Sequence, residues 1–248
     1  MNSDVAGRLA LDAPTVRDLL VTFLRNEAGR IGLDTAVIGL SGGIDSAVTA
    51  YLAAEAFGAD HVVCVMMPYR TSSPDSLSDT REVAMRLNVR NEIVEITPMV
   101  DPLFEKFPAM TNIRRGNVMA RERMIVLYDV SARERGLVIG TGNKTEILLG
   151  YTTLFGDNAC AINPVGDLYK TQLRALAAFL GVPEAIVSKP PSADLWAGQT
   201  DEGEIGVTYA EADEILLLFV DERRTAAEIV AQGYDETTVR KLVNLVVA

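Results

Sequence analysis

The chain has few of the residues from which metal centres and nucleophilic relays are built. Its 248 residues include one histidine, His61, and two cysteines, Cys64 and Cys160, without metal-ligand spacing. A zinc site or a Ser-His-Asp relay is therefore not expected. Cys64 lies inside the apolar run 61–67, which predicts a small buried side chain. Any chemistry must rely on Asp, Glu, Lys, Thr, backbone amides or a bound metal.

Basic residues and long apolar stretches are also scarce. Lys and Arg number 23 against 34 Asp and Glu, so the net charge is −11. Binding of a nucleic acid needs clustered Lys and Arg, and we expect no such partner. No stretch of ~20 apolar residues and no apolar signal-peptide core is present. We therefore expect a soluble, cytoplasmic protein without a membrane partner.

Short apolar runs alternate with segments of helical spacing. Buried strands are predicted at 36–40 and 61–67, and two further strands at 92–96 and 137–140. Helices are predicted at 14–30, 46–57, 75–87, 117–135, 173–180, 209–220, 225–232 and 237–248. The alternation predicts an α/β fold with a doubly wound, mostly parallel sheet, helices on both faces, and a helical C-terminal cluster.

Three segments lie at the predicted carboxyl ends of strands. They are 41–43, 140–143 and the residues after Met67-Pro68. In open parallel sheets, ligands bind beyond the carboxyl ends of the strands. We therefore expect the three segments to converge on one crevice.

The strongest motif is the loop 41–46, Ser-Gly-Gly-Ile-Asp-Ser, between a predicted strand and a predicted helix. Its glycines allow close backbone approach, and its amides together with the helix N-terminus favour a phosphate. Ser41 and Ser46 can donate to phosphate oxygens. Because a carboxylate repels phosphate, Asp45 makes sense as a ligand of Mg²⁺ that bridges the phosphates. The alternative is an ordinary helix cap after a glycine turn.

The loop is not a Walker loop, because the Gly-Lys-Ser/Thr ending is missing. It resembles the SGGxDS signature of the N-type ATP-pyrophosphatases, which transfer AMP from ATP to a substrate oxygen. Five further segments resemble the NAD synthetases of that superfamily and stand in the family's order: 117–124, 140–146, 150–157, 164–172 and 189–204. The resemblance implies an adenine-nucleotide α-hydrolase-like fold, with one NAD synthetase domain over residues 1–248.

The resemblance also assigns roles to individual residues. Positions that match ATP contacts are Gly39, Leu40, Ser41, Gly42, Gly43, Ile44, Asp45, Ser46, Thr141, Lys170 and Ser192. Asp45 and Glu146 match the carboxylates that hold Mg²⁺. Arg121, Leu154 and Ala161 match positions that contact deamido-NAD. Asp45 and Lys170 are the expected catalytic residues, because a lysine can neutralise the phosphates as pyrophosphate leaves.

The implied reaction makes NAD from deamido-NAD, ATP and ammonia through an acyl-adenylate. Only about 35 residues precede the first predicted strand, too few for a glutaminase domain, so free ammonia is the expected nitrogen source. A homodimer is expected by resemblance, with 117–135 as a candidate interface. The long Pro-, Gly- and acid-rich segment 188–206, which contains Trp196, is expected to be a lid.

The chain departs from the family pattern at three places. Many members carry Lys at the position of Leu154 and Asp at that of Ala161, and family chains usually continue beyond the position of Ala248. Leu154 and Ala161 leave open a same-fold adenylating ligase that acts on another carboxylate. A nucleotide-binding regulatory protein without turnover is a further alternative, against which the presence of Asp45, Glu146 and Lys170 argues.

Overall fold

The core of the molecule is a four-stranded parallel sheet. The computed structural model describes residues 3–192 and 200–248. The strands β1 (Ala36–Gly39), β2 (Val62–Met66), β3 (Arg90–Ile93) and β4 (Leu137–Val138) have the order β3-β2-β1-β4. Ala36 pairs with Val62 on one side and with Leu137 on the other. The predicted parallel sheet is confirmed.

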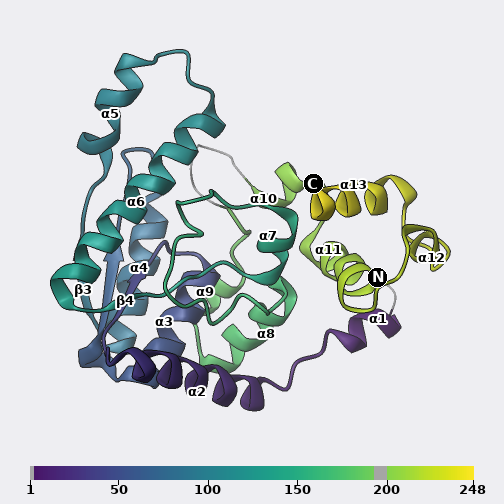
Figure 1. The fold of residues 1–248 in the computed structure, drawn as a ribbon, viewed down its shortest axis with the longest axis horizontal. Helices are drawn as coiled ribbons and strands as arrows, with labels where there is room; N and C mark the ends of the chain where they lie inside the picture. Colours follow the sequence, from purple (N-terminus) through teal and green to yellow (C-terminus); the bar gives the residue numbers. More distant parts are fainter. Residues whose placement is uncertain (1–2, 193–199) are drawn as a thin grey trace.

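Helices cover both faces of the sheet (Figure 1). One face packs against α2 (Ala13–Ile31), α3 (Ile44–Phe57), α4 (Pro74–Leu87) and α8 (Lys170–Leu180). The other packs against α5 (Thr97–Lys106) and α6 (Asn112–Glu134). Side chains alternate along a strand, so Ala36 and Ile38 join the first core and Val37 joins the second. The doubly wound arrangement is confirmed.

A helical cluster stands beside the sheet, on the right of Figure 1. It contains α10 (Asp201–Ile205), α11 (Tyr209–Leu216), the π-helical turn η2 (Leu217–Asp221), α12 (Ala226–Val230) and α13 (Glu236–Val247). The amino-terminal helix α1 (Ser3–Arg8) adds Val5 to the apolar core of this cluster. Two short helices, α7 (Lys144–Leu149) and α9 (Glu184–Val187), and the 3₁₀ turn η1 (Ala59–His61) complete the described elements.

Most element predictions are confirmed, with shifted ends. The third strand lies at Arg90–Ile93 rather than 92–96, and it is an edge strand with mostly exposed residues. Ile96 is instead the buried N-cap of α5. α6 begins at Asn112, five residues before the predicted 117, because the Thr111 side chain accepts a hydrogen bond from the Arg114 amide. α5 was not predicted because Pro98 and Pro102 interrupt its pattern, yet Pro98 stands in the first turn, where proline is tolerated.

The order in which the strands are added to the sheet reverses at β1. The chain runs outward from β1 to β2 and β3, and then returns to place β4 on the other side of β1. Such a switch point opens a crevice between the carboxyl ends of β1 and β4. The glycine loop follows β1, and Gly140 to Asn143 lies after β4.

None of the helices in the described part of the chain is long and apolar enough to cross a lipid bilayer.

Candidate active site

The loop between β1 and α3 is held in one shape by its own side chains. Ser46 Oγ donates to the Gly43 carbonyl at 3.0 Å and accepts from the Ser41 amide at 3.2 Å. Gly42 has a φ of +83°, and a Cβ there would lie 2.6 Å from the Ser76 carbonyl oxygen on α4. Ser46 therefore acts inside the loop, while Gly42 lets the loop approach α4 closely.

The loop presents backbone amides rather than apolar side chains to the crevice. Leu40 and Ile44 bury their side chains in the core, and the Leu40 amide donates to the Val65 carbonyl. Gly43 is the N-cap of α3 and supplies no side-chain cap. The amides of the first turn of α3 are therefore not capped by a side chain, and they carry the positive end of the helix dipole. This is the arrangement that a phosphate binds.

Three residues from distant parts of the sequence meet at the start of α3. The Lys170 ammonium lies 2.5 Å from Asp45 Oδ2 and 3.1 Å from Glu146 Oε1. Asn143 Nδ2 donates to Asp45 Oδ1 at 2.8 Å, and Asn143 also forms a capping box with Glu146 at the start of α7. The predicted metal carboxylates and the predicted catalytic lysine are thus neighbours.

Burial makes the charges of this cluster interdependent. The Lys170 side chain is 2% exposed. Burial lowers the pKa of Lys170, but Asp45 and Glu146 outweigh burial and raise it above its usual value. Burial is the main cause that raises the pKa of Glu146, and the charge of Asp45 adds to it, against the opposing Lys170. The aromatic ring of Tyr209 lies 5.1 Å from the ammonium and contributes a further cation–π contact.

The donor set is suited to a divalent cation that is shared with phosphates. Asp45 and Glu146 reach one cation, the Lys170 ammonium, from two different helices. Within 3–192 and 200–248, no group of three or more His, Cys, Asp or Glu is placed to hold a metal. Mg²⁺ is commonly held by one or two carboxylates, with substrate phosphates and water as the other ligands. The residues present therefore fit Mg²⁺ bound together with ATP.

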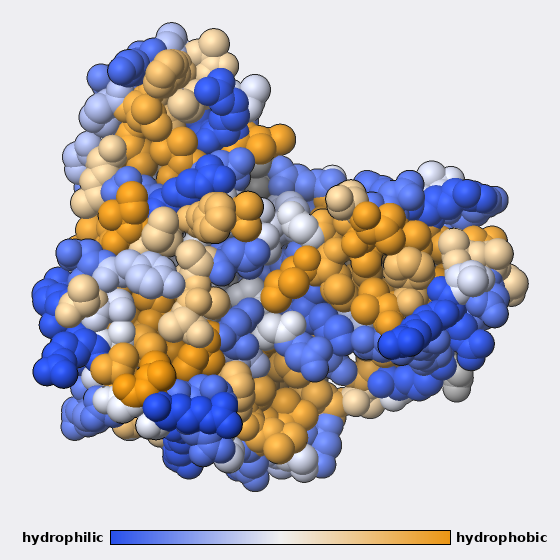
Figure 2. Space-filling model, viewed as in Figure 1, coloured by the Kyte–Doolittle hydropathy of each residue, from blue (hydrophilic) through white to orange (hydrophobic). Residues whose placement is uncertain are grey.

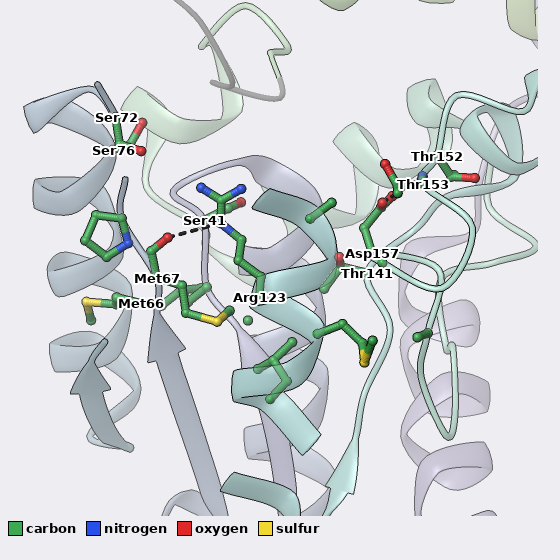
Figure 3. A pocket seen from close by; sticks show the side chains of 18 of the residues that line it. Ser41, Met66, Met67, Ser72, Ser76, Arg123, Thr141, Thr152, Thr153 and Asp157 are labelled. Atoms are coloured by element: carbon green, nitrogen blue, oxygen red, sulfur yellow. Dashed lines mark hydrogen bonds between the residues drawn. The ribbon is translucent and has the colours of Figure 1, made fainter. Parts of the chain in front are cut away.

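A cavity of about 970 Å³ opens over the carboxyl ends of β1, β2 and β4. Asp45, Glu146 and Lys170 are not among its lining residues, whereas Ser41 and Thr141, which precede Asp45 and Glu146 in the sequence by a few residues, are. Its walls include Ser41, Met67, Arg123, Thr141 and Asp157 (Figure 3). Gly140 and Pro68 also line it, so the three segments predicted to converge do so. The volume is that of a site for a large ligand.

Apolar and polar groups line different parts of the cavity. Met66, Leu127, Val138 and Ile139 form an apolar floor near the strand ends. Arg123 Nε donates to the Met67 carbonyl at 3.0 Å, which holds the guanidinium at the cavity wall, where Figure 3 shows it near Ser41. A flat apolar floor beside a cation and an amide-rich loop suits a nucleotide base and its phosphates.

The residues expected at the second substrate lie around α6 and the loop at 150–157. Arg121 Nε donates to the Leu154 carbonyl at 3.2 Å, and both residues are exposed. The Leu154 side chain is apolar and cannot accept a hydrogen bond, so Arg121 contacts the backbone carbonyl of this residue. Ala161 lies apart from this pair, with its amide bonded to the Val138 carbonyl beside β4. Ser192 is exposed at the end of a described segment, while Trp196 and the rest of 193–199 lie outside the described residues.

The structure adds functional candidates that were not singled out. They are Asn143, Arg123, Tyr209, Thr152, Thr153, Asp157 and the serines Ser72, Ser73 and Ser76 at the start of α4. Five of these residues stand inside the segments that resemble the family, and this position in the sequence could have identified them: Asn143, Arg123, Thr152, Thr153 and Asp157. The serines stand in the segment after Met67-Pro68, which was expected at the crevice without naming them. Tyr209 had no such signal, because only the fold brings it to Lys170.

A cluster of tyrosines and acids connects α10 to the site. The Tyr151 hydroxyl donates to Asp201 Oδ1 at 3.2 Å and also contacts Glu204, which lines the cavity. The Tyr209 hydroxyl donates to Asp201 Oδ2 at 3.2 Å. The Asp201 amide in turn donates to the Pro191 carbonyl. The base of the segment expected to be a lid is thus anchored to residues beside Lys170.

Comparison with known proteins agrees with these features. The family model described as NAD synthase matches residues 16–248. A relative from Trichlorobacter lovleyi, an NH₃-dependent NAD⁺ synthetase, is 54% identical over 235 residues, which cover 95% of this chain and 86% of that protein.

Two solved structures share the fold over nearly the whole chain. The NMN synthetase of Francisella tularensis superposes with a TM-score of 0.84 at 33% identity, covering 96% of this chain and 94% of that one. The NH₃-dependent NAD synthetase of Campylobacter jejuni, solved with a nitrate ion, gives 0.81 at 33% identity, with the same two coverages. The chain belongs to the NAD synthase family.

Proposed function

We propose that this chain is an ammonia-dependent NAD synthetase, which converts deamido-NAD and ammonia to NAD with release of AMP and pyrophosphate. The observation that carries the proposal is the meeting of Asp45, Glu146 and Lys170 at the uncapped start of α3, beside the large cavity. The start of α3 would bind phosphate, Asp45 and Glu146 would hold a metal ion, and Lys170 supplies a positive charge between them. The relative at 54% identity, an NH₃-dependent NAD⁺ synthetase, supports the same activity.

The first step is transfer of AMP to the nicotinate carboxylate. A carboxylate oxygen of deamido-NAD attacks the α-phosphorus of ATP, the bond to the bridging oxygen breaks, and pyrophosphate leaves. The amides of loop 41–46 bind the phosphates, and Lys170 neutralises charge that develops as pyrophosphate leaves. Asp45 and Glu146 would hold Mg²⁺, which supplies further charge neutralisation.

The second step forms the amide. Ammonia attacks the acyl carbon, the bond to the AMP oxygen breaks, and the nitrogen loses a proton. Neither step needs a nucleophilic side chain of the protein, which agrees with two cysteines whose pKa values burial raises. Rate enhancement then comes from positioning and from charge neutralisation.

Free ammonia is the nitrogen source in this proposal, and residues 1–248 form one NAD synthetase domain. The support is the NH₃-dependent relative, of which this chain covers 86%. The cytoplasmic location also stays a prediction, which fractionation of the source cells would test.

A second candidate acceptor is favoured by one observation. The NMN synthetase of Francisella tularensis has the higher TM-score of the two structures compared here. An enzyme of that type would amidate nicotinate mononucleotide, which lacks the adenylate half of deamido-NAD. Leu154 and Ala161 stand at positions where many family members carry Lys and Asp, which leaves the choice of acceptor open to test. The two acceptors share the reacting carboxylate, so both require the same ATP site.

The adenylation step is tested by isotope exchange between pyrophosphate and ATP. We expect exchange that requires a pyridine carboxylate acceptor and Mg²⁺ and does not require ammonia. The ratio of kcat/KM for deamido-NAD and nicotinate mononucleotide then decides between the two acceptors, and we expect deamido-NAD to be preferred. Exchange without any acceptor, or none under any condition, would contradict the acyl-adenylate.

We further propose that the protein is a homodimer that pairs through α6 and the loop at 150–157. Ile125 and Leu154, 54% and 62% exposed, extend from the contact between Arg121 and the Leu154 carbonyl. Tyr128 and Phe155 are also exposed in this region. Large apolar side chains gathered on one surface favour a protein partner, and a second copy fits because α6 can pair with itself around a twofold axis.

A further inference from the structure

Asp213 is a carboxylate with no exposed surface that lies outside the cavity. It belongs to α11 in the C-terminal cluster, and α11 packs against both α7 and α8. Asp213 Oδ1 accepts from the Thr145 hydroxyl at 2.6 Å, and Oδ2 accepts from the Thr171 amide at 2.8 Å. One side chain of α11 therefore joins the first turns of α7 and α8, the two helices that supply Glu146 and Lys170.

The two contacts flank the charged groups of the active site. Thr145 directly precedes Glu146, and Thr171 directly follows Lys170. The Thr145 hydroxyl, which donates to Asp213, also accepts from the Lys170 amide at 3.0 Å. The backbones that carry Glu146 and Lys170 are thus locked together through one hydroxyl and one carboxylate.

Burial raises the pKa of the Asp213 carboxyl, and the hydrogen bonds from Thr145 and Thr171 oppose this rise. The carboxylate receives two hydrogen bonds and lies at the amino ends of α7 and α8, where the helix dipoles present positive potential. An asparagine amide cannot replace the Asp213 carboxylate without the loss of a hydrogen bond. An Asn side chain would turn its NH₂ group toward either the Thr171 amide or the Thr145 hydroxyl, and one of the two accepting contacts would disappear.

We propose that Asp213 is a positioning residue that sets the distance between Glu146 and Lys170, and thereby the affinity of the site for Mg²⁺ and ATP. The inference rests on the proposed ATP and Mg²⁺ site. It assigns a positioning role to α11, through the contacts of Asp213 with α7 and α8.

The test is the variant Asp213→Asn, measured by calorimetric binding of ATP at a series of Mg²⁺ concentrations and by steady-state kinetics. We expect the half-saturating Mg²⁺ concentration to rise by about 10- to 100-fold, as for other residues that orient metal ligands. The KM for deamido-NAD should change little, because neither Asp213 nor its partners Thr145 and Thr171 line the cavity.

Glu214→Gln is the matched control. Glu214 is the next residue of the same helix, is 2% exposed, and accepts from the Tyr234 hydroxyl at 2.6 Å, within the C-terminal cluster. Its replacement should lower the melting temperature without raising the Mg²⁺ requirement. If both variants lose stability alike and both bind ATP and Mg²⁺ as the wild type does, Asp213 is only structural and the proposal is wrong.

A second pair of variants covers the case in which Asp213→Asn does not fold. Thr145→Val removes the hydroxyl that links Asp213 to the Lys170 amide, and Thr145→Ser keeps it. We expect a raised half-saturating Mg²⁺ concentration in the Val variant and a near-normal one in the Ser variant. Equal Mg²⁺ dependence in the two would overturn the proposal, whereas a wild type that binds no ATP would instead overturn the proposed function.

Discussion

At the scale of single residues, the site depends on a balance between two acids and one base. Asp45 and Glu146 share the Lys170 ammonium, and Asn143 holds Asp45 from the other side. When Mg²⁺ and ATP bind, the carboxylates would gain a second cation, and Lys170 would gain phosphate oxygens. The ion pairs seen here therefore preorganise the groups for a more crowded complex.

Asp45→Asn should abolish most turnover without unfolding the protein. The amide keeps the shape of the side chain but cannot hold Mg²⁺ with a full charge, so we expect kcat to fall by about 100-fold or more. The measurement is steady-state kinetics at saturating Mg²⁺, with circular dichroism as the check on folding. Asp60→Asn, an exposed change in η1, should leave kcat unaltered. A near-normal rate for Asp45→Asn would show that Asp45 is only part of the helix start.

The Mg²⁺ requirement should depend on pH through Glu146. Burial raises the pKa of Glu146 above the 4.5 of an ordinary glutamate, so protons compete for this carboxylate at a higher pH than usual. As pH falls from neutral into the acid range, the half-saturating Mg²⁺ concentration should rise, approaching about tenfold per pH unit for one proton. Titrations of ATP binding with Mg²⁺ at several pH values would measure this.

Glu146→Gln is the control for the pH effect. Its amide cannot titrate, so its Mg²⁺ requirement should be high and nearly independent of pH over the same range. An unchanged pH dependence in this variant would assign the titration to another group.

At the scale of elements, the strand–loop–helix unit from β1 to α3 is the part whose backbone is most constrained. Gly42→Ala would place a methyl group 2.6 Å from the Ser76 carbonyl oxygen on a residue with a φ of +83°. We expect a loss of roughly 2 to 4 kcal/mol in the free energy of unfolding, and weaker ATP binding in whatever folds. Chemical denaturation and calorimetry would measure both.

Gly43→Ala is the comparison within the same loop. Gly43 has a φ of −91°, and a Cβ there would lie 3.4 Å from Ser41 Oγ, which is an ordinary contact. Its replacement should cost much less stability than that of Gly42. Equal losses would mean that the close approach to α4 is not what requires Gly42.

The elements with strong periodicity could be predicted from the sequence, and those held by tertiary contacts could not. β1, β2, α2 and α3 carry runs of buried residues that identify them at once. α7 has six residues and depends on the capping box of Asn143 and on Asp213 for its position. Its start, and with it the orientation of Glu146, is decided by contacts between residues far apart in the chain.

The same division holds for the active site. Asp45, Glu146 and Lys170 were predictable because each stands in a motif that resembles the family. Tyr209 and Asp213 were not, because their helix gives only an amphipathic pattern. A contact of Ser46 with phosphate stays a prediction. Its hydroxyl contacts the Gly43 carbonyl and the Ser41 amide, which a linear motif cannot reveal.

At the scale of the whole molecule, the site lies between the sheet domain and the C-terminal cluster. Figure 1 shows α7 and α8 between these two parts, and Figure 2 shows the hollowed face between the lobe of α5 and α6 and the lobe of α13. Lys170 and Glu146 are supplied by the intermediate helices, and Tyr209 and Asp213 by the cluster. Catalysis therefore requires that both parts stay docked.

The proposed dimer can be tested by a single change on α6. Ile125→Glu places a charge on an exposed apolar position of the predicted interface, and we expect the protein to sediment as a monomer. Met85→Glu, on an exposed position of α4, is the matched control and should leave the dimer intact. Sedimentation velocity at micromolar concentration would measure both, and a monomeric wild type would contradict the dimer.

The central claim is tested most directly by the products of one reaction. The protein is incubated with ATP, Mg²⁺ and deamido-NAD, with ammonia in one series and glutamine in another, and NAD and AMP are quantified. We predict NAD and AMP in equal amounts with ammonia and no NAD with glutamine. Absence of NAD at every protein concentration with ammonia, from a preparation that is folded and binds ATP, would contradict the assignment.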